Sequence, residues 1–310
     1  MNRIIEVLQT ILPVAVMLCI GMICRSRHLI SREGINALKN VAVNIALPAV
    51  LLSAFATTRY TVMDVVIPLM MFLVCVAAWA MGRAGARIFR LSSRFVPFLT
   101  TGFEAGMLGY ALFNMLYGSS RTAEFARIDL GQVLFVFTLY KVLLGLEGKE
   151  RADAGQLVKE MLLSPIIIAI AAGVLLGAAG IYQALVPSGI SGIFDACTDF
   201  VSAPTSAIIL LAIGYDLVFR DIPWISTGKV VLLRFGIMMI LRFVFIAAVH
   251  LIWPQADLGS AVNVMFILPP PFVLPVFADD ADQRVYVSSA LSVSTLIAVI
   301  GFGVLAALGI

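Results

Sequence analysis

Apolar stretches long enough to cross a bilayer recur along the whole chain, separated by short polar loops. A transmembrane helix needs about 20 predominantly apolar residues, and ten segments of this kind can be recognised. They occupy residues 7–24, 35–56, 65–82, 95–117, 123–146, 161–181, 196–215, 230–253, 258–278 and 285–310. The pattern predicts an all-α polytopic membrane protein with ten transmembrane helices and no soluble domain.

Composition agrees with this pattern, since 61% of the 310 residues are hydrophobic and 13% are charged, against about 25% charged in soluble domains. The cations alternate between loops. Fourteen Lys and Arg residues follow the odd-numbered segments, whereas the opposite side holds four, Arg3, Arg59, Arg121 and Arg127. The positive-inside rule therefore predicts that both termini face away from the cytoplasm. The cations are interpreted as topology signals that also contact lipid headgroups, and no nucleic-acid partner is predicted.

The chain divides near its middle. Residues 147–160 form the longest polar stretch and are interpreted as a cytoplasmic linker between two five-helix halves, 1–146 and 161–310. Five spans in each half give the second half the opposite orientation, which is the inverted-repeat arrangement of many secondary transporters. Pro13 and Gly21 in the first segment are spaced like Pro165 and Gly173 in the sixth.

Two segments at matching positions of the halves should be interrupted. In the fourth, glycines flank an acidic residue in the run Gly102 to Gly109. In the ninth, proline removes backbone donors, so the helix must break where protein or a wet cavity satisfies the freed groups. A half-helix starting near Pro271 would aim its positive end at the membrane centre and favour an anion. The predicted substrate-binding residues here are Gly102, Glu104, Gly106, Pro269, Pro270, Pro271 and Pro275.

Charged residues inside the apolar segments are costly and are candidates for function. Glu104 is a candidate for H⁺ or Na⁺ coupling, or else a structural partner of a buried base. Arg234 and Arg242 in the eighth segment imply a counter-charge, a substrate carboxylate or a route to the surface. Asp129 and Lys141 lie nearer the ends of the fifth segment, where interface placement is expected.

Polar stripes mark the second and seventh segments. Asn36, Asn40 and Asn44 recur every four residues and share one helix face, and Asp199 begins a similar face in the seventh segment. Such stripes either bond neighbouring helices or line a path. Asn44 and Asp199, which lie near prolines, are predicted to line the substrate path.

Three motifs carry a resemblance to a known family. They are Asn44-x-x-x-Pro48, the run Leu268-Pro-Pro-Pro-Phe that ends in Val-Phe-Ala-Asp-Asp280, and Ser292-x-Ser-Thr-Leu296. Together they resemble the auxin efflux carrier family, which includes plant PIN-type auxin exporters and bacterial malate or malonate permeases. The resemblance implies two inverted five-helix repeats with two broken crossover helices, as in NhaA-like antiporters and bile-acid symporters.

The same resemblance implies a scaffold of the first, second, sixth and seventh helices and a mobile transport domain made of the others. It also allows a homodimer through the scaffold helices. The family commonly has asparagine and proline at the fourth-segment crossover, where this chain has Glu104 and glycines. Glu104 is then protonated, or it pairs with Arg242 or Lys141, or the substrate also carries positive charge.

These observations predict a secondary transporter of a small organic anion, namely a carboxylate, an auxin-like molecule or a dicarboxylate. It would work by an elevator-type mechanism in a bacterial inner membrane. A channel would need a continuous polar pore, whereas this sequence offers isolated polar stripes. A membrane-embedded enzyme would need a nucleophile–base pair or clustered metal ligands. The sequence shows no such cluster, since His28 and His250 lie toward opposite faces. Without a phosphate-binding loop, ion or substrate gradients are the expected energy source, with no cofactor or metal.

Overall fold

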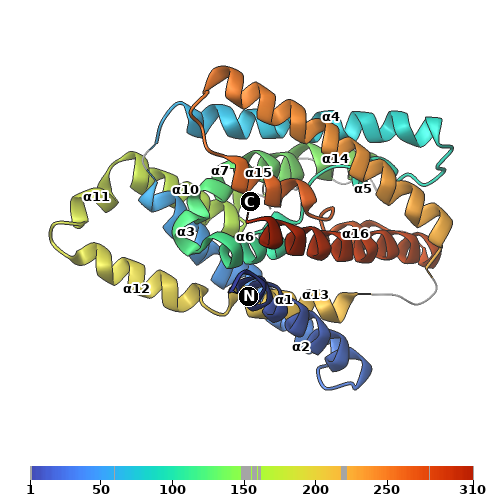
Figure 1. The fold of residues 1–310 in the computed structure, drawn as a ribbon, viewed down its shortest axis with the longest axis horizontal. Coiled ribbons are helices and arrows are strands. Elements are labelled where there is room, and N and C mark those ends of the chain that lie inside the picture. Colours follow the sequence, from blue (N-terminus) through green and yellow to red (C-terminus); the bar gives the residue numbers. More distant parts are fainter. Residues whose placement is uncertain are drawn as a thin grey trace.

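The computed structural model describes residues 2–58, 60–147, 155, 159, 162–217, 222–278 and 280–309 (Figure 1). Every regular element in these ranges is helical. The predicted linker at 147–160 lies mostly outside the described residues, which include Glu147, Gly155 and Lys159 of it.

The first half of the described chain contains helices that match the first five apolar segments. They are α1 (Asn2–Ser26), α2 (Arg32–Val41), the π-helical turn η1 (Ala42–Ala46), α3 (Leu47–Thr57), α4 (Met63–Ile88), α5 (Val96–Leu99), the π-helical turn η2 (Ala105–Gly109), α6 (Tyr110–Tyr117), the 3₁₀ turn η3 (Ser119–Arg121), α7 (Thr122–Phe135), the π-helical turn η4 (Val136–Tyr140) and α8 (Lys141–Glu147).

The second half follows a similar order. Its helices are α10 (Pro165–Ala178), α11 (Ile181–Leu185), α12 (Ile190–Ser202), α13 (Thr205–Asp216), α14 (Trp224–Ile252), α15 (Gly259–Ile267), the 3₁₀ turn η5 (Leu274–Phe277) and α16 (Ala281–Leu308). In Figure 1, α4 and α14 run side by side in opposite directions.

Six helical runs of the described chain are long and apolar enough to cross a membrane. They span Arg32–Thr57, Met63–Ile88, Ser119–Gly145, Ile190–Asp216, Trp224–Ile252 and Ala281–Leu308. Two shorter apolar helices, Ile11–Ser26 and Pro165–Ala178, correspond to the first and sixth predicted segments. The remaining two, the fourth and ninth, are interrupted. The protein is thus an all-helical membrane protein, and the ten-span inverted repeat stays a prediction.

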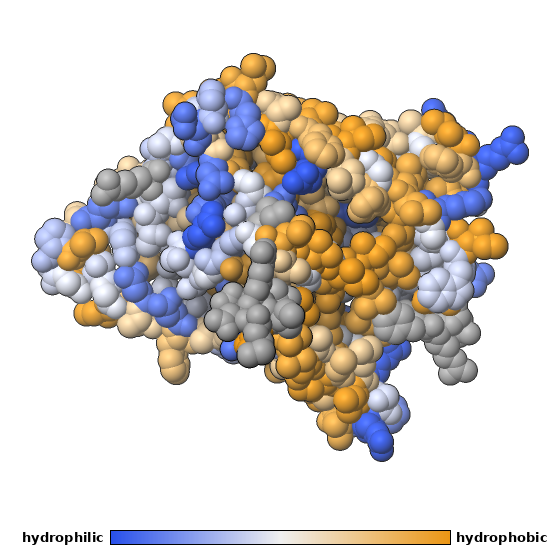
Figure 2. All heavy atoms as spheres, in the orientation of Figure 1, coloured by the Kyte–Doolittle hydropathy of each residue, from blue (hydrophilic) through white to orange (hydrophobic). Residues whose placement is uncertain are grey.

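Apolar side chains also cover the outer surface. Large hydrophobic residues such as Leu175, Phe200 and Leu251 are strongly exposed. Figure 2 shows apolar residues over much of the middle of one face, with hydrophilic residues mainly toward its ends. A surface of this kind is stable against lipid rather than water.

Glycines set two close helix pairs. A Cβ on Gly21 of α1 would lie 2.2 Å from the carbonyl oxygen of Leu211 in α13, and one on Gly173 of α10 would lie 2.8 Å from Cβ of Phe55 in α3. Small residues let helix backbones approach closely in membranes. The pairs α1–α13 and α3–α10 form one side of the molecule, against which α4, α7, α14 and α16 build the other.

Both predicted interruptions are present. Between α5 and η2, residues 100–104 are not helical, so the break lies at the N-terminal side of the predicted glycine run. After α15, residues 268–273 are not helical either. The prediction of a half-helix from Pro271 is wrong, since the 3₁₀ turn Leu274–Phe277 follows instead. Consecutive prolines supply no helical donors and push the residue before each one away from helical geometry.

Candidate functional site

The two interruptions touch each other. The amide nitrogen of Glu104 donates to the carbonyl oxygen of Pro269 at 2.9 Å. Gly102 has φ +68°, and a Cβ there would come within 2.9 Å of the Pro271 ring. The position needs glycine for both its left-handed backbone and the close approach. The predicted residues Gly102, Glu104, Pro269 and Pro271 are therefore brought together.

The Glu104 side chain links the two interruptions. One carboxylate oxygen, Oε1, accepts from the amide of Met107 at 3.3 Å and caps η2. The other, Oε2, accepts from the amide of Phe272 at 2.5 Å, across the second interruption. A carboxylate that accepts from backbone amides makes strong, charge-assisted hydrogen bonds. Glu104 thus satisfies N–H groups that the broken helices leave without helical partners.

Arg234 plays the complementary part from α14. Its side chain is 5% exposed and lies against the ring of Phe103, 5.6 Å from the ring centroid. Arginine carries donors only, and a break in a membrane helix leaves carbonyls that need donors. The guanidinium donates to the carbonyl oxygens of Leu99 (3.1 Å), Thr101 (3.5 Å), Gly102 (2.8 Å) and Leu268 (2.9 Å).

A cavity of about 350 Å³ opens beside the two interruptions. It lies between α2, α3, α10 and α13 on one side and the interrupted segments with α7 and α8 on the other. Of the predicted site residues, it is lined by Glu104, Gly106, Asp129, Lys141 and Pro271. Charged and polar groups that the sequence scatters over three segments therefore share one interior space.

Asp129 is 2% exposed, so its expected placement at a membrane interface is wrong. Its carboxylate accepts from the hydroxyl of Tyr110 at 2.9 Å and from the side-chain amide of Gln132 at 3.1 Å. Those donors make burial of the carboxylate tolerable, since a buried polar group is costly only when it lacks partners.

Other predicted residues lie elsewhere. Asn44 on η1 and Asp199 on α12 are exposed and do not line this cavity. Arg242 donates to the Asn263 side chain rather than pairing with Glu104. Pro270 is buried within the second interruption, and Pro275 lines the adjoining vestibule.

That vestibule has a volume of about 590 Å³ and shares Lys39, Asp216 and Phe272 with the cavity. Asp216 pairs with Arg32 at 2.6 Å and with Lys39, so this ion-pair cluster lies where the two spaces meet. Among the described residues, the vestibule lining holds one carboxylate, that of Asp216, and four cations. The cations are Arg25, Arg32, Lys39 and Arg284.

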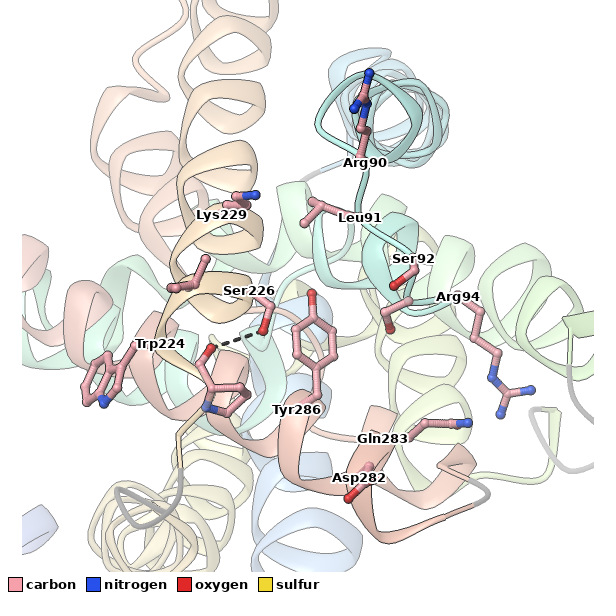
Figure 3. A pocket seen from close by; sticks show the side chains of 13 residues that line it. Arg90, Leu91, Ser92, Arg94, Trp224, Ser226, Lys229, Asp282, Gln283 and Tyr286 are labelled. Carbon is pink, nitrogen blue, oxygen red and sulfur yellow. Dashed lines mark hydrogen bonds between the residues drawn. The ribbon is translucent and has the colours of Figure 1, made fainter.

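A third hollow, of about 960 Å³, lies where α4 ends and where α14 and α16 begin (Figure 3). Tyr286 points toward its centre, and the Ser226 hydroxyl donates to the carbonyl of Pro223 at 3.1 Å. Arg90 and Trp224 extend toward its rim. None of the predicted site residues lines this cleft, so it is separate from the interrupted helices.

Sequence reasoning missed several residues of the site. Lys39 counted only as a topology signal, and Asp216 lies at the end of an apolar run, where a charge is ordinary. Tyr110 and Gln132 look like packing residues until Asp129 is known to be buried. Of these missed residues, Asn263 could have been found from the sequence, because it is an amide side chain inside an otherwise apolar helix.

Comparison with known proteins gives one informative similarity. The chain is 23% identical over 299 residues to an uncharacterized transporter of Methanothermobacter thermautotrophicus, covering 94% of this chain and 95% of the relative. No family model matches the chain. With the membrane-spanning helices, this similarity indicates a membrane transport protein.

Proposed function

We propose that the protein is a secondary carrier that moves a small organic anion across the cytoplasmic membrane. The observation that carries the anion assignment is the vestibule, whose described lining holds four cations and one carboxylate. A concave surface lined by one sign of charge concentrates ligands of the opposite sign. The vestibule leads to the cavity at the interrupted helices through Lys39, Asp216 and Phe272.

The proposed route begins in the vestibule. Its cations come from the end of α1, from α2 and from the start of α16. They are among the cations that the positive-inside rule places on the cytoplasmic side. An incoming carboxylate competes with Asp216 for Lys39 and Arg32, and so loosens the ion-pair cluster between the two spaces. The anion then enters the cavity beside Pro271 and Lys141.

The proposed mechanism is an elevator-type movement within two inverted repeats. Supporting this, the cavity lies between the side built from α1–α13 and α3–α10 and the side that carries both interruptions. The glycines that pack those pairs, Gly21 and Gly173, also occupy matching positions of the two halves. The finer assignments follow the resemblance to auxin efflux carriers: two crossover helices, an inner-membrane location and termini outside the cytoplasm.

Coupling to an ion gradient is assigned to Glu104. Its carboxylate faces the cavity and bridges both interruptions, so gain of H⁺ or Na⁺ there changes a bond that joins them. Binding of H⁺ or Na⁺ at this residue would thereby bias the movement of the side of the molecule that carries both interruptions.

The test is flux into proteoliposomes over a panel of mono- and dicarboxylates, amino acids and auxin-like aromatics, with imposed proton and sodium gradients. We expect saturable uptake of at least one anion, without chemical change. Lys39→Gln should lower that uptake several-fold. Lys229→Gln, which removes a cation from the cleft of Figure 3, is the matched control and should leave it unchanged.

Three outcomes contradict the proposal. Failure of every solute to move excludes this carrier, flux that does not saturate indicates a channel, and a chemically altered solute indicates an enzyme. Equal uptake by the Lys39→Gln and Lys229→Gln variants removes the vestibule from the route.

A further inference from the structure

Arg242 lies in α14 with a neutral partner. Its Nε and Nη2 donate to the same side-chain oxygen of Asn263, at 3.2 and 2.5 Å, and Asn263 is itself buried in α15. In the part of the chain that the structure describes, no carboxylate pairs with this guanidinium. An arginine at membrane depth is costly without a compensating charge or water. Its charge is therefore not balanced by a described residue.

A cavity of about 240 Å³ adjoins Arg242, between α14, α15 and α16. Its lining is apolar apart from Arg234, Arg242, Asn263 and Ser294, and it includes no carboxylate among the described residues. Arg234 is already bonded to four carbonyls, so of the two cations in the lining Arg242 is the one with donors left for a ligand. The cavity shares no lining residue with the cavity beside Glu104.

This cavity opens to the apolar surface of the protein. Phe235, Met239 and Ile297 line it and are also among the exposed hydrophobic residues. In a bilayer, that surface faces lipid chains, so a ligand would enter sideways from the membrane. Its volume lies below the roughly 300–1,000 Å³ of sites for drug-sized ligands, which restricts the ligand to a short apolar body.

The depth of Arg242 in the membrane decides between two kinds of ligand, a small amphiphile and a membrane phospholipid. The 29 residues of α14 have their midpoint at Met238, so the Cα of Arg242 lies about 6 Å beyond the midpoint at 1.5 Å per residue. Helical side chains lean toward the N-terminus, which directs Arg242 back toward the membrane centre. With the α14 midpoint at the centre of a hydrocarbon core about 30 Å thick, this Cα lies about 9 Å inside the boundary and its side chain points farther inward, which disfavours a phospholipid phosphate at the interface. A free carboxylate on a short chain reaches it.

We propose that this cavity binds an amphipathic carboxylate, with Arg242 and Asn263 holding the head and Phe235, Met239 and Ile297 contacting the apolar body. The site goes beyond the proposed carrier function, because its cavity shares no lining residue with the cavity beside Glu104. Its test measures binding and not flux.

The experiment photolabels the full-length protein in nanodiscs with a diazirine-bearing octanoate analogue, and maps the labelled peptides. We expect saturable labelling in α14 or α16 that octanoate displaces and octanol does not. Arg242→Gln should lower the saturable labelling at least tenfold, whereas Arg242→Lys keeps part of it. Arg87→Gln, at an exposed position of α4, is the control and should label like the native protein.

A second pair of variants leaves Arg242 intact, in case Arg242→Gln does not fold. A Cβ on Gly301 would make ordinary contacts of 3.5 Å with Ile267, so Gly301→Ala should bind normally while Gly301→Met fills the cavity and blocks labelling. The proposal is overturned by native labelling in a folded Arg242→Gln or Gly301→Met variant. Equal labelling by the matched alcohol, or displacement by dioctanoyl phosphatidylglycerol and not by octanoate, also overturns it.

Discussion

Two residues of opposite charge satisfy the backbone where the helices are interrupted. Glu104, which only accepts hydrogen bonds when ionised, accepts from the amide of Met107 in η2 and from the amide of Phe272 in the second interruption. Arg234, which only donates, bonds four backbone carbonyls. Each charge thus serves the kind of backbone group that it can bond. Both residues are buried where the interrupted segments meet. Because the Glu104 carboxylate already accepts from two backbone amides, a glutamate beside the proposed anion path is compatible with an anionic substrate.

At Arg234 we predict that even a conservative change destabilises the protein. Lysine has three donors on a point charge and cannot span four carbonyls, and each buried group left unbonded costs about 1–3 kcal/mol. Arg234→Lys should lower the thermal unfolding midpoint in detergent by several degrees. Arg87→Lys, an exposed arginine on α4, is the control. Equal midpoints for the two variants would show that the carbonyl contacts contribute little.

At Glu104 we predict a change in coupling. Glutamine keeps an oxygen acceptor but cannot take up a proton or carry the charge that attracts Na⁺. Flux through the Glu104→Gln variant should therefore no longer respond to imposed proton and sodium gradients. The control is Glu124→Gln, where the carboxylate pairs with Arg121 at a partly exposed position. A Glu104→Gln carrier that still follows the gradient would remove this residue from coupling.

At the scale of elements, glycine contacts and proline interruptions decide which helices can approach one another. A Cβ on Gly214 would lie 2.2 Å from the carbonyl oxygen of Leu18, which is backbone and cannot rotate away. In the ninth segment, prolines end α15 and leave a short 3₁₀ turn in place of a second helix. Glycine thus permits close contact between helices, and the prolines interrupt a helix and expose its backbone to a cavity.

The Gly214→Ala variant should accordingly push α1 and α13 apart and destabilise the protein by roughly 1–3 kcal/mol, the range of overpacked cores. Gly236→Ala on α14 meets no atom within 4 Å and should cost nothing, or stabilise the helix slightly. Thermal unfolding of the two variants in the same detergent measures the difference. A Gly214→Ala protein as stable as the Gly236→Ala protein would contradict the close packing.

At the scale of the whole molecule, the distribution of cations between loops predicts the orientation in the membrane. The vestibule, with its four cations, belongs to the side that the positive-inside rule assigns to the cytoplasm. The turn after α11 is predicted to lie on the opposite side. Anions would thus meet the cavity from the cytoplasm in the conformation described here.

Orientation can be tested with single cysteines in a variant whose four native cysteines are replaced by alanine. Ser188→Cys, in the exposed turn after α11, should react with a membrane-impermeant maleimide in intact cells. Ser26→Cys, exposed at the end of α1, should react only after the cells are permeabilised. Labelling with the opposite pattern would reverse the predicted topology.

The amino-acid sequence alone predicts the helical, membrane-embedded character and both interruptions, because apolar length and the backbone effects of glycine and proline act locally. It also marked Glu104 as a candidate, since a charge in an apolar segment is conspicuous, but it placed Asp129 and Lys141 at an interface, whereas both line the cavity beside Glu104. Tertiary structure decided the rest. Three of the four carbonyls that Arg234 bonds lie more than one hundred residues from it. Lys39 and Asp216, which line both the vestibule and the cavity, are also more than one hundred residues apart. No local pattern encodes such pairings, because helix packing alone brings those backbone and side-chain groups within bonding distance.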